Sequence, residues 1–419
     1  MESSNNIRVT EVRLVSNSTI EVKMDISGEV KNYFKSNSFT TEYSCELLSI
    51  PYGVAVIPFL CNILPIAWLT DSQIECDELD SDFFECIPQF KEGYRKMYPT
   101  LDFKGHLTCR KVSCSSSENK HLQDKSLMFF SGGVDAFATL FAHMEEHPSL
   151  FILLGSDIRM NNIEGWSNVS RQLANTASAY HLPTLQCKSN FREFINESLL
   201  TQMVNKLGIV GGWWHEFQHG IGLLGHAAPL AWKYGYTKIY IASTFTIRDY
   251  GRVTCASDPT IDNYVQFAGA RVFHDQYEFN RQQKIRHIVD FCKRNNTSAF
   301  LRVCWQGDKG VNCCKCEKCY RTIVGLSAEG EDAHQWGFDD FDLNQIKNEL
   351  KYNMELPTHV IPFWQDIQDR IKETPIGTNQ VEWLRDYNIN NLNDNYYKRM
   401  LKFLKRIKRY IKRQLNKKR

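Results

Sequence analysis

The chain has 419 residues, of which 42% are hydrophobic and 23% are charged. These values are typical of a soluble globular protein rather than a disordered or fibrous one, and the length allows two or three domains with cores of their own. The net charge of +2 hides an asymmetry, because residues 395–419 carry twelve Lys or Arg and no acid, which leaves 38 basic against 48 acidic side chains in residues 1–394.

Residues 1–115 are expected to form a small, separate α+β domain. Apolar and polar residues alternate over Arg8–Val15 and Thr19–Ile26, which predicts two paired strands, and a helix is expected over Ser81–Met97. Two more strands are expected over Gln73–Cys76 and Phe103–Val112. No catalytic constellation stands out, so we expect a packing or substrate-shaping role. The polar start of the chain predicts no secretory signal.

One stretch of this domain, Leu47–Leu69, contains no charged residue and is long enough to suggest a transmembrane helix. Several prolines, together with Gly53 and Asn62, interrupt it. We therefore expect a buried strand over Val54–Ile57 followed by a core helix over Phe59–Leu69.

The stretch Leu127–Leu140 (LMFFSGGVDAFATL) predicts a buried strand, a Gly-Gly turn and then a helix. Such a turn leaves backbone N–H groups unpaired at the start of a helix, and with the helix dipole they form an anion site that suits phosphate. Ser131 adds a hydroxyl donor, and Asp135 is placed one turn later to hold Mg²⁺. No Gly-Lys-Ser/Thr follows, so the stretch is not a Walker A loop.

Strands and helices alternate from Ser126 onward, which predicts an α/β domain over residues 126–330 with a parallel sheet and helices on both faces. A helical extension is expected over residues 331–394. Ligands of such sheets bind outside the carboxyl ends of the strands. The polar residues expected at that edge are Ser131, Asp157, Asn190, Arg192, Ser243 and His274.

A long helix is expected over Trp213–Tyr234, and its first half (WWHEFQHGIGLLG) is the expected substrate side. Gln218 and His219 are candidates for substrate recognition, and ordinary structural histidines are the alternative. His215 and His219 also frame an HExxH string with Glu216 as the general base, so a zinc protease is a further, less favoured hypothesis.

The segment that follows the fourth strand of this domain contains further candidates. Ser257, Asp258 and Asp262 could bind a second Mg²⁺ or a substrate amine. Alternatively, Ser257 could cap a short helix that begins at Pro259.

Five of the fourteen cysteines lie within residues 304–319. Four of them, in the pattern C-x8-C-x2-C-x2-C, can place their sulfurs about 2.3 Å from one tetrahedral ion. This spacing predicts a structural Zn²⁺ site, with an iron–sulfur cluster as the alternative. The expected ligands are Cys304, Cys313, Cys316 and Cys319. Cys314, the fifth cysteine, is not an expected ligand, and it lies where glycine would make the turn more easily. The clustering of the cysteines indicates a reducing compartment.

The SGGVDA loop resembles the SGGxDS loop of the PP-loop ATP pyrophosphatases, which split ATP into AMP and pyrophosphate while activating a substrate. Together with the four-cysteine pattern, residues 126–328 resemble 7-cyano-7-deazaguanine synthase and its relatives. Ala136 departs from the family pattern, since it replaces a serine hydroxyl that contacts phosphate. Ile241–Asp262 does not match the family's substrate loop, so the family's substrate is not carried over.

The resemblance implies an adenine-nucleotide alpha-hydrolase-like PP-loop fold with ATP, Mg²⁺ and Zn²⁺. The residues it assigns to pyrophosphate and Mg²⁺ are Ser131, Gly132, Gly133, Val134 and Asp135. Those it assigns to adenosine are Gly155 and Asp157, and those assigned to secondary phosphate contacts are Arg281 and Lys284. The substrate side is expected to involve Gln218, His219, Ser243 and Asp258.

We expect a cytoplasmic, AMP-forming ligase or amidating enzyme. A carboxylate or carbonyl group of a small molecule or peptide would attack the α-phosphate, and an amine, ammonia or sulfur donor would then displace AMP. Ala136 favours one alternative, a nucleotide-binding protein without turnover. A sulfur-transfer enzyme with Cys187 or Cys255 as carrier is another, and a homodimer is left open.

Residues 395–419 predict a basic amphipathic helix with one apolar stripe, formed by Met400, Leu404, Ile407, Ile411 and Leu415. Such a helix suits an anionic membrane surface, which would make the protein peripheral on the inner face of the membrane. Nucleic acid is the second choice. A tail docked on the acidic body of the protein is the third.

Overall fold

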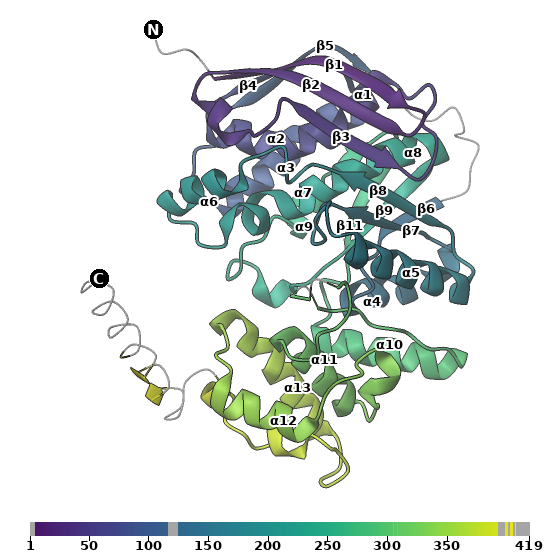
Figure 1. Cartoon of the computed structure of the whole chain (residues 1–419), viewed down its shortest axis with the longest axis vertical. Helices are drawn as coiled ribbons and strands as arrows, with labels where there is room; N and C mark the ends of the chain where they lie inside the picture. Colours follow the sequence, from purple (N-terminus) through teal and green to yellow (C-terminus); the bar gives the residue numbers. More distant parts are fainter. Residues whose placement is uncertain are drawn as a thin grey trace. The chain divides into compact units, whose positions relative to one another are not determined.

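The computed structural model describes residues 5–115, 125–304, 306–307 and 309–392, together with 399–400, 403–404 and 407. The chain divides into two compact units (Figure 1). The first comprises residues 1–278 and 308–310, and the second comprises residues 279–307 and 311–419.

The first unit is built on one mixed sheet, whose order over the described strands is β10-β11-β9-β6-β7-β8-β3-β2-β1-β4-β5. The strands are β1 (Asn6–Ser16), β2 (Thr19–Ser27), β3 (Ser38–Tyr43), β4 (Gln73–Asp80), β5 (His106–Ser113), β6 (Lys125–Phe129), β7 (Ser149–Leu154), β8 (Thr184–Ser189), β9 (Tyr236–Ala242), β10 (Gln266–Phe267) and β11 (Ala270–Asp275). The sequence predicted an α/β fold with a parallel sheet over residues 126–330. The observed sheet is larger and mixed but mostly parallel, which confirms the α/β class.

Five neighbouring strands, β8, β7, β6, β9 and β11, are parallel. Numbered in chain order from β6, they lie in the order third, second, first, fourth, fifth, which is the order of doubly wound folds. The direction of winding reverses between β6 and β9. β7 is buried along its whole length, which indicates that both faces of the sheet are covered there.

The two faces are covered by different helices. On one side α4 (Val134–Ala142) and α5 (Ile163–Tyr180) share an aromatic contact, with the rings of Phe141 and Tyr180 5.5 Å apart. On the other side α7 (His219–Leu224) and α8 (Ala228–Tyr234) belong to the main hydrophobic cluster, which does not include α4. Helices on both faces were expected for the sheet of residues 126–330, and the part of that range within the first unit has them.

The first five strands extend this sheet instead of forming a module of their own. β3 pairs antiparallel with β8, with Thr41 opposite Ser189 and Tyr43 opposite Cys187. The expected boundary near residue 115 therefore differs from the observed division at residue 278. Strand pairing between segments far apart in sequence leaves no local pattern, so the sequence did not reveal this continuity.

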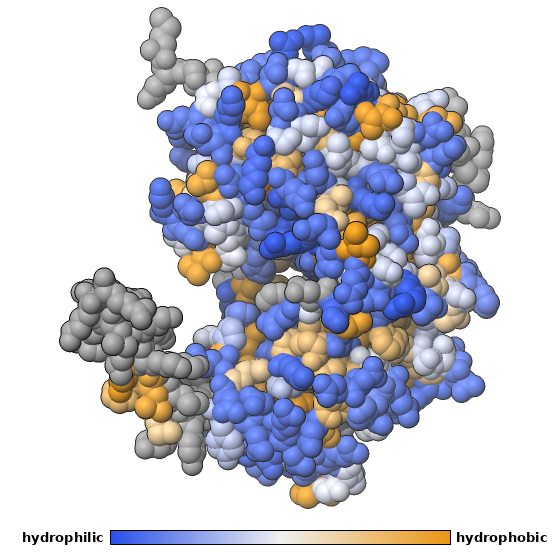
Figure 2. All heavy atoms as spheres, viewed as in Figure 1, coloured by the Kyte–Doolittle hydropathy of each residue, from blue (hydrophilic) through white to orange (hydrophobic). Residues whose placement is uncertain are grey.

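The outer half of the sheet is covered on one face only. β2 alternates buried and partly exposed residues, and α2 (Ile57–Leu69) and α3 (Ser81–Met97) pack against β4 and β5. The uncovered face carries ion pairs such as Arg13–Glu21 at 2.8 Å and Lys23–Glu11 at 3.0 Å. Figure 2 shows mostly hydrophilic residues in the visible part of this region.

The uncharged stretch Leu47–Leu69 is helical. The core helix was predicted correctly as α2, but the strand expected over Val54–Ile57 is wrong, because α1 (Tyr52–Ala55) lies there. A Cβ at Gly53 would lie 2.7 Å from the Asp80 nitrogen, so this helical turn packs directly on the end of β4. None of the described helices is long and apolar enough to cross a membrane.

The second unit is helical. Its main helices are α10 (Arg281–Asn295), α11 (Glu317–Ala328), α12 (Leu343–Asn348) and α13 (Ile361–Glu373). Within the extension expected over residues 331–394, the structure has α12, α13 and several short helical turns up to residue 392, and α13 packs against α10 and α11. The remaining helices of the first unit are α6 (Glu197–Lys206) and α9 (Pro259–Asp262). The basic helix predicted over residues 395–419 falls almost wholly outside the described residues and stays a prediction.

Candidate functional site

The Gly-Gly turn lies directly between β6 and α4, as the sequence predicted. The Phe130 amide still donates to the Phe151 carbonyl of β7 at 2.8 Å, so the strand ends only there. Gly132 has a φ of +74°, a conformation that favours glycine, and Gly133 is the N-cap of α4. The Gly133 amide lies 3.4 Å from Ser131 Oγ. The turn therefore presents backbone donors and one hydroxyl at the positive end of a helix.

The first residues of α4 differ in what they expose. Val134 is fully buried, so only its backbone amide could serve a ligand. Asp135 lies in the first turn of the helix and is partly exposed. Ala136 is 3% exposed, and its methyl group packs in the core. The family that this stretch resembles has a serine hydroxyl at the position of Ala136. Here a buried methyl group takes its place.

β7, the neighbour of β6, ends in a second glycine turn. Gly155 has a φ of +102°, and a Cβ there would lie 2.0 Å from the Ser189 carbonyl oxygen of β8. The Gly155 amide donates to the Ile158 carbonyl at 2.9 Å, and Asp157 is exposed within the turn. Both predicted turns thus lie at the carboxyl edge of the sheet.

Three other polar residues expected at this edge have structural partners. The Asn190 side chain accepts from the Thr40 amide at 2.9 Å and so joins β8 to β3. Arg192 pairs with Glu197 at 2.7 Å and lies 4.1 Å from the centre of the Trp214 ring. Ser243 is completely buried, which leaves no exposed surface of it for a substrate in this structure.

The long helix expected over Trp213–Tyr234 is interrupted by a π-helical segment, Trp214–Gln218. Gln218 is 1% exposed, and its amide group donates to Asn62 Oδ1 at 2.8 Å and to the Phe191 carbonyl at 3.0 Å. The structure therefore puts Gln218 in the core. His219 is partly exposed and packs edge-on against Trp214.

The glutamate of the HExxH string is buried and hydrogen-bonded. Glu216 is 4% exposed, and Tyr98 donates to its carboxylate at 2.5 Å. Among the described residues, His215 and His219 belong to no cluster of three or more metal-ligating side chains. The glycines of this run serve packing, since a Cβ at Gly220 would lie 2.4 Å from the Ala256 carbonyl oxygen.

A pocket of about 370 Å³ lies beyond the ends of β9 and β11. Most of its wall comes from the segment between these strands, within the region Ile241–Asp262 singled out in the sequence. Asp258, a predicted substrate contact, lines the pocket but also caps α9, where it accepts from the Thr260 amide at 2.8 Å. The predicted cap at Ser257 is thus wrong by one residue.

A buried acid–histidine pair forms part of this pocket. His274, on β11, lines the pocket, and its Nδ1 lies 2.8 Å from Asp262 Oδ2. Ser257 Oγ donates to the same carboxylate oxygen at 2.8 Å. Burial raises the pKa of Asp262, and the hydrogen bonds from His274 and Ser257 oppose that rise. The sequence analysis named Asp262 and His274 separately. It did not predict their contact, because only the fold brings them together.

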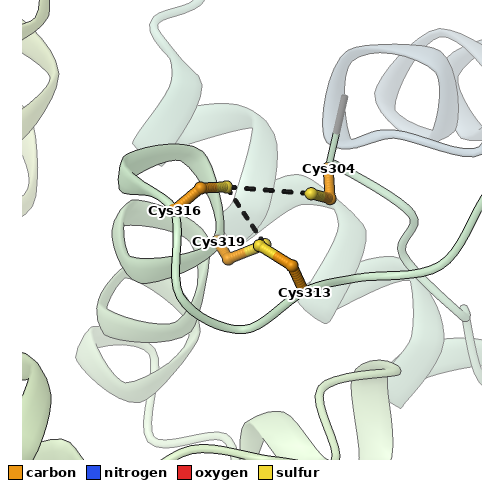
Figure 3. Close-up of side chains that lie close together, drawn as sticks. All are labelled: Cys304, Cys313, Cys316 and Cys319. Carbon is orange, nitrogen blue, oxygen red and sulfur yellow. Dashed lines mark hydrogen bonds between the residues drawn. The ribbon is translucent and has the colours of Figure 1, made fainter. Parts of the chain in front are cut away.

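The four predicted cysteine ligands of the second unit converge (Figure 3). Their sulfurs all lie within 4.8 Å of one another. The Cys304–Cys316, Cys313–Cys319 and Cys316–Cys319 separations are 3.8, 3.9 and 3.5 Å. Four sulfurs about 2.3 Å from a tetrahedral Zn²⁺ would lie about 3.8 Å apart, so the cluster could hold such an ion.

Local structure prepares the cluster for a metal. Cys316 is the N-cap of α11, and hydrogen bonds from Cys319, Cys313 and Cys304 lower the pKa of its thiol. The Lys315 amide lies 3.5 Å from the Cys313 sulfur. Cys314 has a φ of +53°, the left-handed conformation that favours glycine, which agrees with its expected role as the spare residue in the turn.

Asn312 is a supporting residue that the sequence analysis missed. Its Oδ1 accepts from the amides of Val303 and Cys304, at 2.9 and 3.3 Å. Its Nδ2 donates to the carbonyls of Leu301 and Gly337, at 2.7 and 2.8 Å. The side chain therefore fixes the Cys304 segment against the Cys313 turn, and its place immediately before Cys313 was the available signal.

The predicted phosphate contacts Arg281 and Lys284 lie in the first turns of α10, in the second unit. Both are buried, at 3% and 0% exposed. Of the predicted thiol carriers, Cys187 is 1% exposed, and burial raises its pKa. Burial likewise raises the pKa of Cys255 to about 12, so neither thiol has thiolate character at neutral pH.

No protein-family model and no curated protein matches this chain.

Proposed function

We propose that the protein is an ATP-dependent, AMP- and pyrophosphate-forming ligase of the PP-loop type. A carboxylate of the substrate attacks the α-phosphate of ATP, which gives an acyl-adenylate and pyrophosphate. A nucleophile then displaces AMP. The chemistry requires neutralised phosphate charge and correct positioning more than a nucleophile supplied by the protein.

One observation carries the proposal: the Ser131-Gly132-Gly133 turn opens α4 between β6 and β9, where the strand order reverses. In doubly wound sheets this reversal creates the crevice in which nucleotides bind. A glycine-rich turn at a helix N-terminus is the usual phosphate site of such crevices. The two features were inferred independently, one from the sequence and one from strand pairing.

Each residue of this edge receives a role. The amides of the turn and Ser131 Oγ hold the pyrophosphate portion of ATP, and Asp135 holds the Mg²⁺ that shields it. The turn at Gly155 and Asp157 receives adenosine at the end of β7. The pocket beyond β9 and β11 receives the second substrate, on the same edge of the sheet.

The four-cysteine cluster is assigned a structural Zn²⁺. Four sulfurs leave no open coordination position, and the cysteine pair Cys316 and Cys319 ties the start of α11 to the Cys304 segment. The zinc therefore takes no part in the chemistry and stabilises the second unit.

Pyrophosphate release tests the function. The purified protein should release pyrophosphate from Mg-ATP when heat-treated cell extract supplies the substrates. Asp135→Asn should abolish the release, whereas Asp102→Asn, at an exposed loop position, should not change it.

A protein that binds Mg-ATP but releases no pyrophosphate with any extract would contradict the ligase proposal. It would favour the nucleotide-binding alternative that Ala136 suggests.

A further inference from the structure

We propose that the pocket beyond β9 and β11 binds a primary-amine acceptor, and that His274 is the base that takes a proton from this amine. The inference rests on the proposed ligase function, whose second step needs such a nucleophile. It names the class of acceptor and the residue that activates it.

The pocket wall selects the class of ligand. Aromatic and aliphatic side chains dominate it, including Phe245, Tyr250, Val253 and Tyr264. No Lys or Arg is among the described residues that line it, so a phosphate or carboxylate would find no cation there. Two carboxylates, Asp249 and Asp258, belong to the wall. An amine on an apolar or aromatic body fits these surroundings.

His274 has the geometry of a general base. Its Nδ1 is engaged by Asp262 at 2.8 Å, which fixes the orientation of the ring and favours a proton on Nδ1. Nε2 then carries the free lone pair, and the side chain lines the pocket. This arrangement of an oriented imidazole beside a ligand cavity is the one that nucleophile activation uses. Asp262 is the positioning residue, and Ser257 holds it in turn.

A second buried histidine shows the contrast. His226 is completely buried, and both of its nitrogens are bonded, Nδ1 to the Gly222 carbonyl at 2.8 Å and Nε2 to Ser189 Oγ at 2.9 Å. Burial lowers its pKa to about 4, so it stays neutral in the core. His226 is a structural histidine. The His274 side chain instead lines the pocket, and only its Nδ1 is engaged by Asp262.

The strand order puts the phosphate turn and the pocket on one edge of the sheet. β9 lies between β6 and β11, so the strands that carry the turn and His274 are two strand spacings, about 10 Å, apart. The pocket therefore lies on the edge where the acyl-adenylate would form. In the step, the amine nitrogen bonds to the acyl carbon and the carbon–oxygen bond to AMP breaks. The proton lost from nitrogen goes to His274 Nε2.

The first test is chemical modification of the full-length protein. Diethylpyrocarbonate acylates an accessible imidazole nitrogen, and peptide mass spectrometry locates the product. We expect His274 to react although it is only 5% exposed, and His226 to stay unmodified. Equal resistance of the two histidines would overturn the inference and leave the ATP proposal untouched.

The second test separates the two steps of the reaction. With Mg-ATP and heat-treated extract, His274→Gln should release about one pyrophosphate per chain and then turn over roughly 100-fold or more slowly than wild type, the usual scale for loss of a general base. Hydroxylamine, which needs no base at neutral pH, should restore turnover. Asp262→Asn should behave in the same way but with a smaller defect.

Three results would count against the inference. Wild-type turnover by His274→Gln would show that His274 is not the base. Loss of the first pyrophosphate as well would assign His274 to folding or to the ATP step. Absence of pyrophosphate release from the wild-type protein would instead refute the ligase function itself, together with the base role that depends on it.

Discussion

At the residue scale, Asn312 supports the geometry of the cysteine cluster. Its four hydrogen bonds hold the Cys304 segment against the turn that carries Cys313. Asn312→Ala should weaken zinc affinity by roughly 10- to 100-fold, the usual effect of removing a supporting residue, in a chelator competition assay. Asn295→Ala, at an exposed site on α10, is the control and should leave affinity unchanged.

A second residue makes the stability of the first unit depend on pH. His143 caps α4, and its nitrogens lie 3.1 Å from Asp275 and 3.2 Å from Glu146. Burial lowers the pKa of His143, but its hydrogen bonds and charge interactions with Asp275 and Glu146 outweigh this, and the net pKa is raised. The protonated form is therefore the stabilising one.

The sign of the pH effect follows from this shift. The stabilisation is complete below the unfolded pKa of about 6.5 and is lost as pH rises through the higher folded pKa. His143→Gln should therefore lower the free energy of unfolding more at pH 5.5 than at pH 9, as measured by urea titration. His106→Gln, at an exposed site, is the control. A larger loss at pH 9 would contradict the assignment.

At the scale of elements, the end of β7 depends on a close approach to β8. A Cβ at Gly155 would lie 2.0 Å from the Ser189 carbonyl oxygen. Gly208 also has a positive φ, of +89°, but nothing lies within 4 Å of an added Cβ. Gly155→Ala should therefore destabilise the protein by about 1–3 kcal/mol more than Gly208→Ala, measured by denaturant unfolding. Equal losses would show that strain in φ, and not the close approach, matters here.

The sequence predicted most elements because hydrophobic periodicity is local. It located α3 with the observed bounds, and the turn between β6 and α4. It failed at Val54–Ile57, where β-branched residues favour a strand but packing against β4 favours a helix. It also missed the pairing of β3 with β8, since the hydrogen-bonding edge of a strand is not encoded in its own residues.

For the candidate sites too, the sequence predicted local patterns and missed contacts that only the fold creates. The four cysteines were predicted because their ligand spacing is a local pattern. The Asp262–His274 pair was not predicted, since it joins α9 to β11. Gln218 was assigned to substrate because it lies beside His219 in the first half of the helix expected over Trp213–Tyr234, yet here its amide group bonds within the core.

At the scale of the whole molecule, the two units should respond differently to loss of metal. The cysteine cluster belongs wholly to the second unit. Removing the proposed zinc with a chelator should therefore raise hydrogen exchange in α11 and its neighbours, measured by mass spectrometry, because the site ties the start of α11 to the Cys304 segment. Exchange in β6, β7 and β9 should stay unchanged. A uniform rise across both units would contradict a local structural role.

Isothermal titration calorimetry measures whether the turn at Ser131–Gly133 and the carboxylate of Asp135 bind Mg-ATP, as we propose. We expect one Mg-ATP per chain for the wild-type protein, no measurable binding for Asp135→Asn, and unchanged binding for Asp102→Asn. Absence of heat with the wild-type protein, or equal binding by Asp135→Asn, would contradict it.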